Sequence, residues 1–464
     1  MRIELSVPIE TAALLKRLGH VAGGKPPEYI RAVCTDSRRV QPGDLYIALR
    51  GEKDDGHRYL AKAQAGGASF LLSEREFPGA LRVKSTREAL GALATISLEA
   101  RRPRVIGITG SVGKTTAKEY MAAVLSADYR VHRTNENENN EIGLPKTILT
   151  RPADCEILIA EFGTNHPGEI AAHTALCRPD IAVITLIGQA HLGAFGSREA
   201  IFAEKTAILS ASPPPLALLN RDDDLLSGIR LSGSVGVALH APADITAADI
   251  RVGADFVTFT AKGDGFTEEC TLSGSGKERI YAALFALGVG RIFGVSLSDA
   301  VCALKKAVPP KSRQQIINGS SCTLIDDAYN ASPESVRAAL ELLSALAGSR
   351  RRIAILGDML ELGDRTESLH EDAGRSAAGF ADRLFAFGEM AHAYAAGAIL
   401  GGMRKEAVMT FDDPESCAEA VCGSIIPRDI LLVKSSHAAG GYKITEKLTD
   451  FLSGHTRPET IPPQ

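Results

Sequence analysis

The segment from Arg104 to Thr116 constrains the fold of this chain more than any other stretch. Its β-branched run from Val105 to Thr109 predicts a buried strand, and Lys114 opens a predicted helix that continues to about Leu125. The glycines between them free backbone N–H groups to close on phosphate oxygens, and the helix N-terminus adds its positive dipole end. A nucleotide phosphate site is predicted, although Ile108 takes the place of the usual first glycine. The alternative is a tight turn followed by a solvated lysine.

Polar residues further along the chain fit the metal chemistry of such a site. Thr115 would offer its hydroxyl to Mg²⁺. The predicted strand from Ile157 to Ala160 ends at Glu161, and a carboxylate at the carboxyl end of a strand beside a phosphate loop can ligate Mg²⁺ directly or through water. The next predicted strand, Asp180 to Thr185, leads to His191 at the same edge. That histidine either serves the site or is structural.

The length of 464 residues corresponds to about three domains. We predict boundaries at 1–102, 103–310 and 311–464. The first is a small α/β unit. In the second, strands and helices alternate, which predicts a largely parallel sheet with helices on both faces, and the third is a doubly wound α/β domain. The predicted fold class is therefore α/β throughout, with the phosphate loop in the central domain.

Several elements and one ligand-binding edge follow from the pattern. Ile9, Ala12, Leu15 and Leu18 are expected to share one helical face, residues 256–272 to form a hairpin, and Tyr281 to begin an apolar helix. In the third domain, predicted strands end in polar clusters at the edge where open parallel sheets bind ligands: Asp326 to Asn330, Gly357 to Met359, and Lys434 to His437.

Composition excludes several classes of protein. The net charge of −4 argues against a nucleic-acid-binding surface. The eight cysteines are scattered without zinc spacing and are expected to be reduced thiols. No signal peptide and no membrane span is predicted, so we expect a cytoplasmic protein, and a monomer. The tail from Arg457 to Gln464 is expected to be disordered.

Read together, these stretches resemble the Mur ligase family over nearly the whole chain. In the first domain the resemblance rests on Asp36-Ser-Arg38, Gly43-Asp-Leu45 and Asp55-Gly-His57. In the central domain it rests on residues 109–115, Asn139-Asn-Glu-Ile-Gly-Leu-Pro145, Gly168-Glu-Ile170, Ala190-His-Leu192 and Phe195-Gly-Ser197. In the third it rests on Asp326-Asp-Ala-Tyr-Asn-Ala331 and Leu356-Gly-Asp-Met-Leu-Glu-Leu-Gly363.

The resemblance implies an ATP-dependent ligase of cell-wall precursor synthesis. The closest pattern is that of the member that joins D-alanyl-D-alanine to UDP-N-acetylmuramoyl-tripeptide through an acyl phosphate. The resemblance also implies two Mg²⁺ ions, held by Thr115, Glu161, His191 and Lys205. Lys205 would be carbamylated, because an unmodified ammonium cannot ligate a cation.

Further roles are implied residue by residue. Catalytic roles are implied for Lys114, Glu161, His191 and Lys205. ATP contacts are implied for Thr109, Gly110, Ser111, Val112, Gly113, Lys114, Thr115, Thr116, Arg313, Asp327 and Asn330. Substrate contacts are implied for Ser37, Arg38, Asn139, Asn140, Lys434, Ser436 and His437, with the first domain holding the UDP end.

The chain departs from the family pattern at the adenine side. The family helix there begins Gly-x-His-Asn, whereas this chain has Gly276-Lys277-Glu278-Arg279. Arg279 could still stack its guanidinium on any purine, whereas the missing amides would have distinguished adenine from guanine. A raised KM for ATP and only a modest preference over GTP are therefore predicted, unless Asn330 alone provides the discrimination. Two other readings stay open: a related ligase with another amine or acid, and a nucleotide-binding scaffold without turnover.

Overall fold

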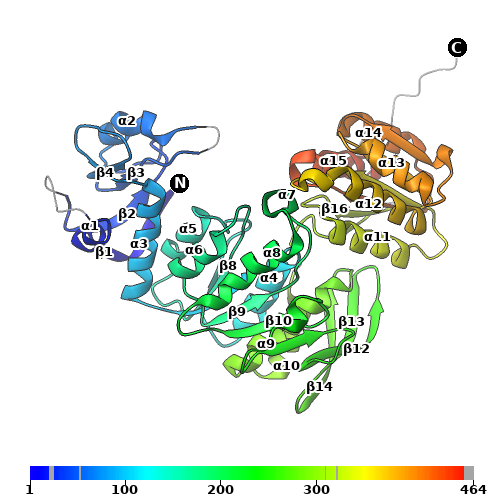
Figure 1. Ribbon diagram of the computed structural model, residues 1–464, viewed down its shortest axis with the longest axis horizontal. Coiled ribbons are helices and arrows are strands. Elements are labelled where there is room, and N and C mark those ends of the chain that lie inside the picture. Colours follow the sequence, from blue (N-terminus) through cyan, green and yellow to red (C-terminus); the bar gives the residue numbers. More distant parts are fainter. Residues whose placement is uncertain (20–25, 52–53, 309, 320–321, 454–464) are drawn as a thin grey trace.

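Three β-sheets, one after another along the chain, organise this computed structural model (Figure 1). The structure describes residues 1–19, 26–51, 54–308, 310–319 and 322–453. The predicted tail, 457–464, lies outside these residues. Within the described residues, no helix combines the length and the apolar character needed to cross a membrane. The predicted α/β class is confirmed, because all three sheets carry helices.

The first sheet has five strands in sequential order, with β1 antiparallel to β2 and the others parallel. Its strands are β1 (Arg2–Glu10), β2 (Tyr29–Cys34), β3 (Leu45–Ile47), β4 (Phe70–Ser73) and β5 (Ala80–Arg82). Its helices are α1 (Thr11–Arg17), α2 (Leu60–Ala65) and α3 (Thr86–Ala100), with a short 3-10 turn η1 (Gly56–Tyr59).

The predicted helical face in this region was wrong in part. Ile9 lies in β1, where it pairs with Ile30 of β2, because strand pairing continues up to the first residue of α1. Ala12 is exposed, and the helix instead buries Leu14 and Leu15.

The second sheet has nine strands in the order β14-β13-β12-β11-β10-β9-β6-β8-β7. The strands from β12 to β7 in this order are parallel, and β13 and β14 add an antiparallel hairpin at one edge. Their bounds are β6 (Arg104–Thr109), β7 (Val131–Arg133), β8 (Ile157–Glu161), β9 (Ile181–Ile184), β10 (Leu216–Asn220), β11 (Val235–Ala238), β12 (Ile245–Val252), β13 (Phe256–Gly263) and β14 (Phe266–Ser273). The predicted hairpin is therefore confirmed.

Helices cover both faces of this sheet, as the alternation predicted. One core packs α4 (Lys114–Leu125), α9 (Glu278–Phe293) and α10 (Leu297–Lys306) against one face. The other face packs against α5 (Gly143–Leu149), α6 (Glu169–Leu176) and α8 (Arg198–Thr206), and a single-turn helix α7 (Leu192–Phe195) precedes α8. Short 3-10 turns are η2 (Ala207–Ser210) and η3 (Leu226–Gly228). Helix α9 begins at Glu278, earlier than predicted, because an acid is favourable in a first helical turn even without an apolar pattern.

The third sheet has six strands in the order β15-β16-β20-β17-β18-β19, all parallel except β15. Its strands are β15 (Gln315–Asn318), β16 (Thr323–Asp327), β17 (Arg352–Gly357), β18 (Arg383–Phe387), β19 (Val408–Phe411) and β20 (Ile430–Lys434). One face packs α11 (Pro333–Ala347), α12 (Thr366–Phe380) and α13 (Ala391–Leu400), and the other packs α14 (Pro414–Ser424) and α15 (Gly441–Leu452). Short 3-10 turns are η4 (Gly363–Arg365), η5 (Lys405–Ala407) and η6 (His437–Ala439).

The chain passes between sheets in two connections. One lies between Ala100 and Arg104, and the other between Lys306 and Gln315. The boundaries 102/103 and 310/311 fall inside these connections and stay predictions; Pro309 lies outside the described residues. The third sheet region approaches the second near α7, which contacts η4 (Figure 1).

Candidate functional site

The phosphate loop joins β6 to α4 as the sequence predicted. Gly110 has φ 145°, and a Cβ there would lie 1.9 Å from the Thr185 hydroxyl oxygen, so the position accepts only glycine without movement of Thr185. Gly113 has φ 88° and forms the N-cap of α4. The loop is thereby pressed against the end of β9, which leaves its other side open.

Lys114 extends along this open side. Its Nζ donates a hydrogen bond to the Gly110 carbonyl at 2.6 Å. Burial lowers the pKa of Lys114 from its usual value, and Glu161 opposes that shift. A partly desolvated ammonium interacts more strongly with an incoming phosphate than a surface lysine would.

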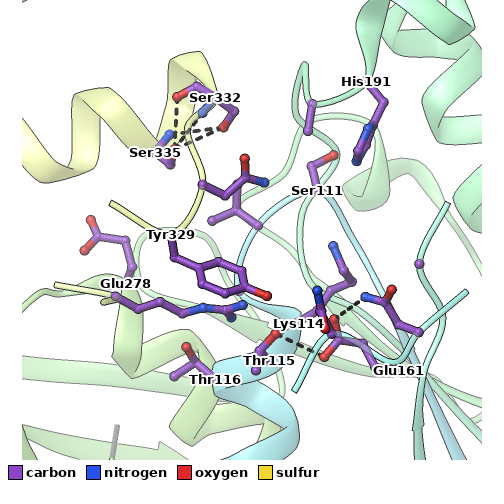
Figure 2. A pocket seen from close by; sticks show the side chains of 18 of the residues that line it. Ser111, Lys114, Thr115, Thr116, Glu161, His191, Glu278, Tyr329, Ser332 and Ser335 are labelled. Atoms are coloured by element: carbon purple, nitrogen blue, oxygen red, sulfur yellow. Dashed lines mark hydrogen bonds between the residues drawn. The ribbon is translucent and has the colours of Figure 1, made fainter. Parts of the chain in front are cut away.

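Thr115 and Glu161 meet where the sequence predicted a metal site. The Thr115 hydroxyl donates to one Glu161 carboxylate oxygen at 3.0 Å, and the Asn139 side-chain amide donates to the other at 2.9 Å (Figure 2). Glu161 is almost fully buried. The Lys118 ammonium lies 3.6 Å from the same carboxylate and donates to the Glu136 carbonyl at 3.2 Å. Sequence reasoning missed Lys118. Its position one helical turn after Lys114 could have indicated that it lies on the same side of α4, near the phosphate loop.

This donor set fits Mg²⁺, because a hydroxyl and a carboxylate stand together beside a phosphate loop. Mg²⁺ takes one or two protein oxygens and completes its shell with water and phosphate oxygens. Among the described residues, no group of three or more His, Cys, Asp and Glu side chains is arranged to hold a metal.

A cavity of about 400 Å³ adjoins the loop and is lined from both the second and the third sheet regions. The structure brings fourteen of the predicted site residues to its wall: Ser111, Val112, Gly113, Lys114, Thr115, Thr116, Asn139, Asn140, Glu161, His191, Arg313, Asp327, Asn330 and Lys434. Thr109, Gly110, Lys205, Ser436, His437, Ser37 and Arg38 do not line it.

Asp327 and Lys434 enter the cavity wall as a buried ion pair. Their charged atoms are 2.8 Å apart, and the Lys434 ammonium also donates to the Asn330 carbonyl at 2.6 Å. Burial raises the pKa of Asp327, while Lys434 opposes the shift. Lys434 was expected at the peptide-binding end with Ser436 and His437. Its ammonium pairs with Asp327 because the two residues are opposite each other on the neighbouring strands β16 and β20, and the substrate role of Lys434 stays a prediction.

The other two members of that expected cluster lie outside the cavity. Ser436 is buried and accepts a hydrogen bond from the Leu360 N–H at 3.0 Å. His437 is exposed and stacks on Tyr442, with ring centroids 5.2 Å apart. Tyr329, which sequence reasoning did not single out, lines the cavity, and the Arg313 guanidinium lies 4.2 Å from its ring centroid.

Other predicted substrate residues differ in how they are engaged. Asn140 lines the cavity, but its side-chain oxygen already accepts from the Gly143 N–H at 2.9 Å. Arg38 is exposed in the first domain and pairs with Asp36 at 2.9 Å, and Ser37 lies beside it. Neither Ser37 nor Arg38 reaches the cavity, so any role at the UDP end lies elsewhere on the substrate.

His191 and Lys205 occupy different surroundings. His191 lies on the loop after β9, with φ 63°, and its Nδ1 pairs with the carboxylate of Glu361 from the third domain. That contact lowers the pKa of Glu361.

Lys205 is 2% exposed, and no hydrogen bond or ion pair of its ammonium is found within the described part of the chain. Burial lowers the pKa of Lys205 well below its usual value, and Lys114 adds to the shift.

The predicted adenine contact of Arg279 stays a prediction, and Arg279 does line the cavity. Its Nε donates to the Ser275 carbonyl at 2.6 Å and its Nη2 to the Arg313 carbonyl at 2.7 Å, so backbone carbonyls hold the edge of the guanidinium. These bonds lie in the plane of the group and do not occupy the faces that would stack on a base. Glu278 also lines the cavity, across Tyr329 from Lys114 (Figure 2). The modest preference for ATP over GTP likewise stays a prediction.

Comparison with known proteins gives the same account along the whole chain. Residues 29–97 match the Mur ligase family catalytic domain, 108–290 the Mur ligase middle domain, and 312–437 the Mur ligase glutamate ligase domain. The UDP-N-acetylmuramoyl-tripeptide–D-alanyl-D-alanine ligase of Bacillus subtilis is 35% identical over 441 residues, covering 92% of this chain and 95% of that one. The Escherichia coli ligase of the same name is 36% identical over 375 residues, covering 78% and 82%.

Solved structures show the same similarity in three dimensions. MurF from Acinetobacter baumannii superposes with a TM-score of 0.88 at 29% identity, covering 97% of this chain and 100% of that one. MurF from Thermotoga maritima in complex with ADP gives a TM-score of 0.83 at 26% identity, covering 91% and 98%. From the matched domains and the identity shared with full-length relatives, this chain belongs to the Mur ligase family.

Proposed function

We propose that this protein joins D-alanyl-D-alanine to UDP-N-acetylmuramoyl-tripeptide at the expense of ATP, releasing ADP and phosphate. The observation that carries the proposal is a single cavity in which Lys114 and the Thr115–Glu161 pair of the central domain face Arg313, Asp327 and Asn330 of the third. Similarity over nearly full length to ligases of that name supports the choice of substrates.

The reaction has two steps, each with a clear electron balance. A carboxylate oxygen of the tripeptide forms a bond to the γ-phosphorus, and the bond from that phosphorus to the β–γ bridging oxygen breaks, giving an acyl phosphate and ADP. The amine of D-alanyl-D-alanine then attacks the acyl carbon, phosphate leaves with the C–O electron pair, and the amine loses a proton. Both steps bring anions together, so the protein has to supply positive charge and positioning.

The residues of this chain would share that work. Lys114 and the loop amides would bind the β- and γ-phosphates. Thr115 and Glu161 would hold a first Mg²⁺, and Glu161, His191 and carbamylated Lys205 a second. When bound, Mg²⁺ would neutralise phosphate charge during transfer. Arg313 and Asn330 would hold the nucleotide from the third domain, and Asn139 the muropeptide.

Carbamylation of Lys205 is the least usual part of this proposal. A carbamate forms when a neutral amine attacks carbon dioxide, with the nitrogen losing a proton. Burial and the positive charge of Lys114 lower the pKa of Lys205, which favours its neutral amine. Once formed, the carbamate anion would be stabilised by the positive charge of Lys114. We further propose that the protein works as a monomer in the cytoplasm; its eight unpaired cysteines fit a reducing compartment.

ADP release tests the proposal. The purified protein is supplied with ATP, Mg²⁺ and all combinations of acceptor and amine, including tripeptides ending in diaminopimelate, lysine or ornithine. Release that requires both a UDP-N-acetylmuramoyl-tripeptide and D-alanyl-D-alanine supports the proposed ligase. Release with another amine identifies a different ligase, and ATP binding without any release identifies a scaffold.

A further inference from the structure

The segment from Leu186 to Gly193, called here the bridging segment, lies directly against the phosphate loop. The Ser111 N–H donates to the Leu186 carbonyl at 2.8 Å, and the Gly188 N–H donates to the Ser111 hydroxyl at 2.9 Å. The preceding residue, Thr185, donates its hydroxyl to the Val112 carbonyl at 2.6 Å. The position of Ser111 and Val112 therefore depends on where the bridging segment lies.

The third domain contacts the bridging segment from the other side. Glu334 accepts a hydrogen bond from the Gln189 N–H at 2.8 Å. Its carboxylate covers Gly188 so closely that a Cβ on that residue would lie 2.8 Å from the Glu334 Cδ. Further along, the Gly193 N–H donates to the Glu361 carbonyl at 2.9 Å. One short stretch of backbone thus connects the phosphate loop to the third domain.

Glu334 is not needed for its own helix. It lies in the first turn of α11, where an acid usually serves the helix N-terminus. Ser332 already caps that helix in a capping box with Ser335, so the Glu334 carboxylate is free to reach across to Gln189. Its second oxygen is buried without a hydrogen-bond partner among the described residues. A half-satisfied buried carboxylate is costly, so the contact with the bridging segment has to offset that cost.

We propose that Glu334 is a positioning residue for ATP: by holding the Gly188–Gln189 peptide, it sets the geometry of Ser111 in the phosphate loop and so makes ATP affinity depend on docking of the third domain. This inference rests on the proposed function only in taking ATP as the ligand. Glu334 is not among the residues that line the cavity, and its hydrogen bond goes to the bridging segment, through which it acts.

A double-mutant cycle tests the link. The dissociation constant for ATP with Mg²⁺ is measured by isothermal titration for the full chain carrying Glu334→Ala, Ser111→Ala or both. Glu334→Ala should weaken ATP binding by about tenfold, the effect of one hydrogen bond to a charged group. In the Ser111→Ala background the same change should have an effect below about twofold, because the Gly188–Ser111 hydrogen bond, the link next to the Gln189 contact, is already removed.

Two further variants separate a positioning role of Glu334 from a general weakening of the contact between the third and central domains. Glu334→Gln keeps an acceptor for the Gln189 N–H and should bind ATP within about threefold of the wild type. Glu341→Ala is the matched control, since Glu341 lies on the same helix and also crosses to the central domain, pairing with Lys277 at 2.6 Å away from the loop. Its effect should be independent of Ser111→Ala.

Each outcome decides the matter. Equal effects of Glu334→Ala in both backgrounds, a Glu334→Gln variant as weak as Glu334→Ala, or coupling of Glu341→Ala to Ser111→Ala would each overturn the inference. A wild-type protein that binds no ATP would overturn both this inference and the proposed function. Coupling between Glu334→Ala and Ser111→Ala in a protein that does not ligate D-alanyl-D-alanine would support the inference and refute the proposed amine substrate.

Discussion

Replacing Lys114 with methionine should abolish most of the turnover while leaving the fold intact. The ammonium donates to the Gly110 carbonyl at 2.6 Å, and burial lowers its pKa, so it acts in surroundings less polar than water. Two unit charges about 4 Å apart at an effective dielectric constant of about 20 interact with about 4 kcal/mol. At about 1.4 kcal/mol per tenfold change, that energy corresponds to almost 10³ in rate. Loss of one preorganised donor commonly costs on the order of 10²–10³, so kcat should fall within that range.

The stability of the same variant should not fall. No ion pair of Lys114 is found in the described part of the chain, and its folded-state pKa is lowered, so burial disfavours its charge. Methionine retains most of the apolar stem, and we expect Tm to be unchanged or slightly raised.

The assay is ADP release at saturating ATP, UDP-N-acetylmuramoyl-tripeptide and D-alanyl-D-alanine, with thermal unfolding measured in parallel. Lys306→Met, which removes an exposed lysine at the end of α10, is the control and should leave both quantities unchanged. Turnover of Lys114→Met within tenfold of the wild type, at equal Tm, would refute the electrostatic role assigned to this lysine.

Three more outcomes are expected. Lys205→Ala should be nearly inactive and partly restored by short carboxylates that replace the carbamate; full activity of a protein whose density or intact mass shows a bare amine would contradict this. Asp327→Asn should lower the free energy of unfolding by about 3–5 kcal/mol, because it leaves Lys434 buried and unpaired, and adding Lys434→Met should recover most of that loss in denaturant titrations. Thr115→Val should raise the Mg²⁺ concentration needed for half-maximal turnover without changing KM for D-alanyl-D-alanine, and an unchanged Mg²⁺ titration would remove Thr115 from the metal site.

The sequence alone determined the local architecture around the phosphate loop. The β-branched run before Gly110 and the helix after Gly113 are contiguous in sequence, so their hydrogen bonds depend mainly on neighbours within a few residues. The same holds for the strand that ends at Glu161, because a short apolar run bounded by polar residues fixes both its type and its end. The helical face proposed around Ile9 failed because pairing with a distant strand extended β1 to the edge of α1.

Only the tertiary structure decided which charges face one another. The Asp327–Lys434 pair joins residues that lie on neighbouring strands of the third sheet but far apart in the chain, and the contact of His191 with Glu361 joins two domains. Arg279 could be assigned to a base from its chemistry, but only the fold shows that two backbone carbonyls hold its guanidinium at the cavity wall. The type of a residue determines which partners its side chain can bind. Strand order, register and domain docking determine which of those partners lies within reach.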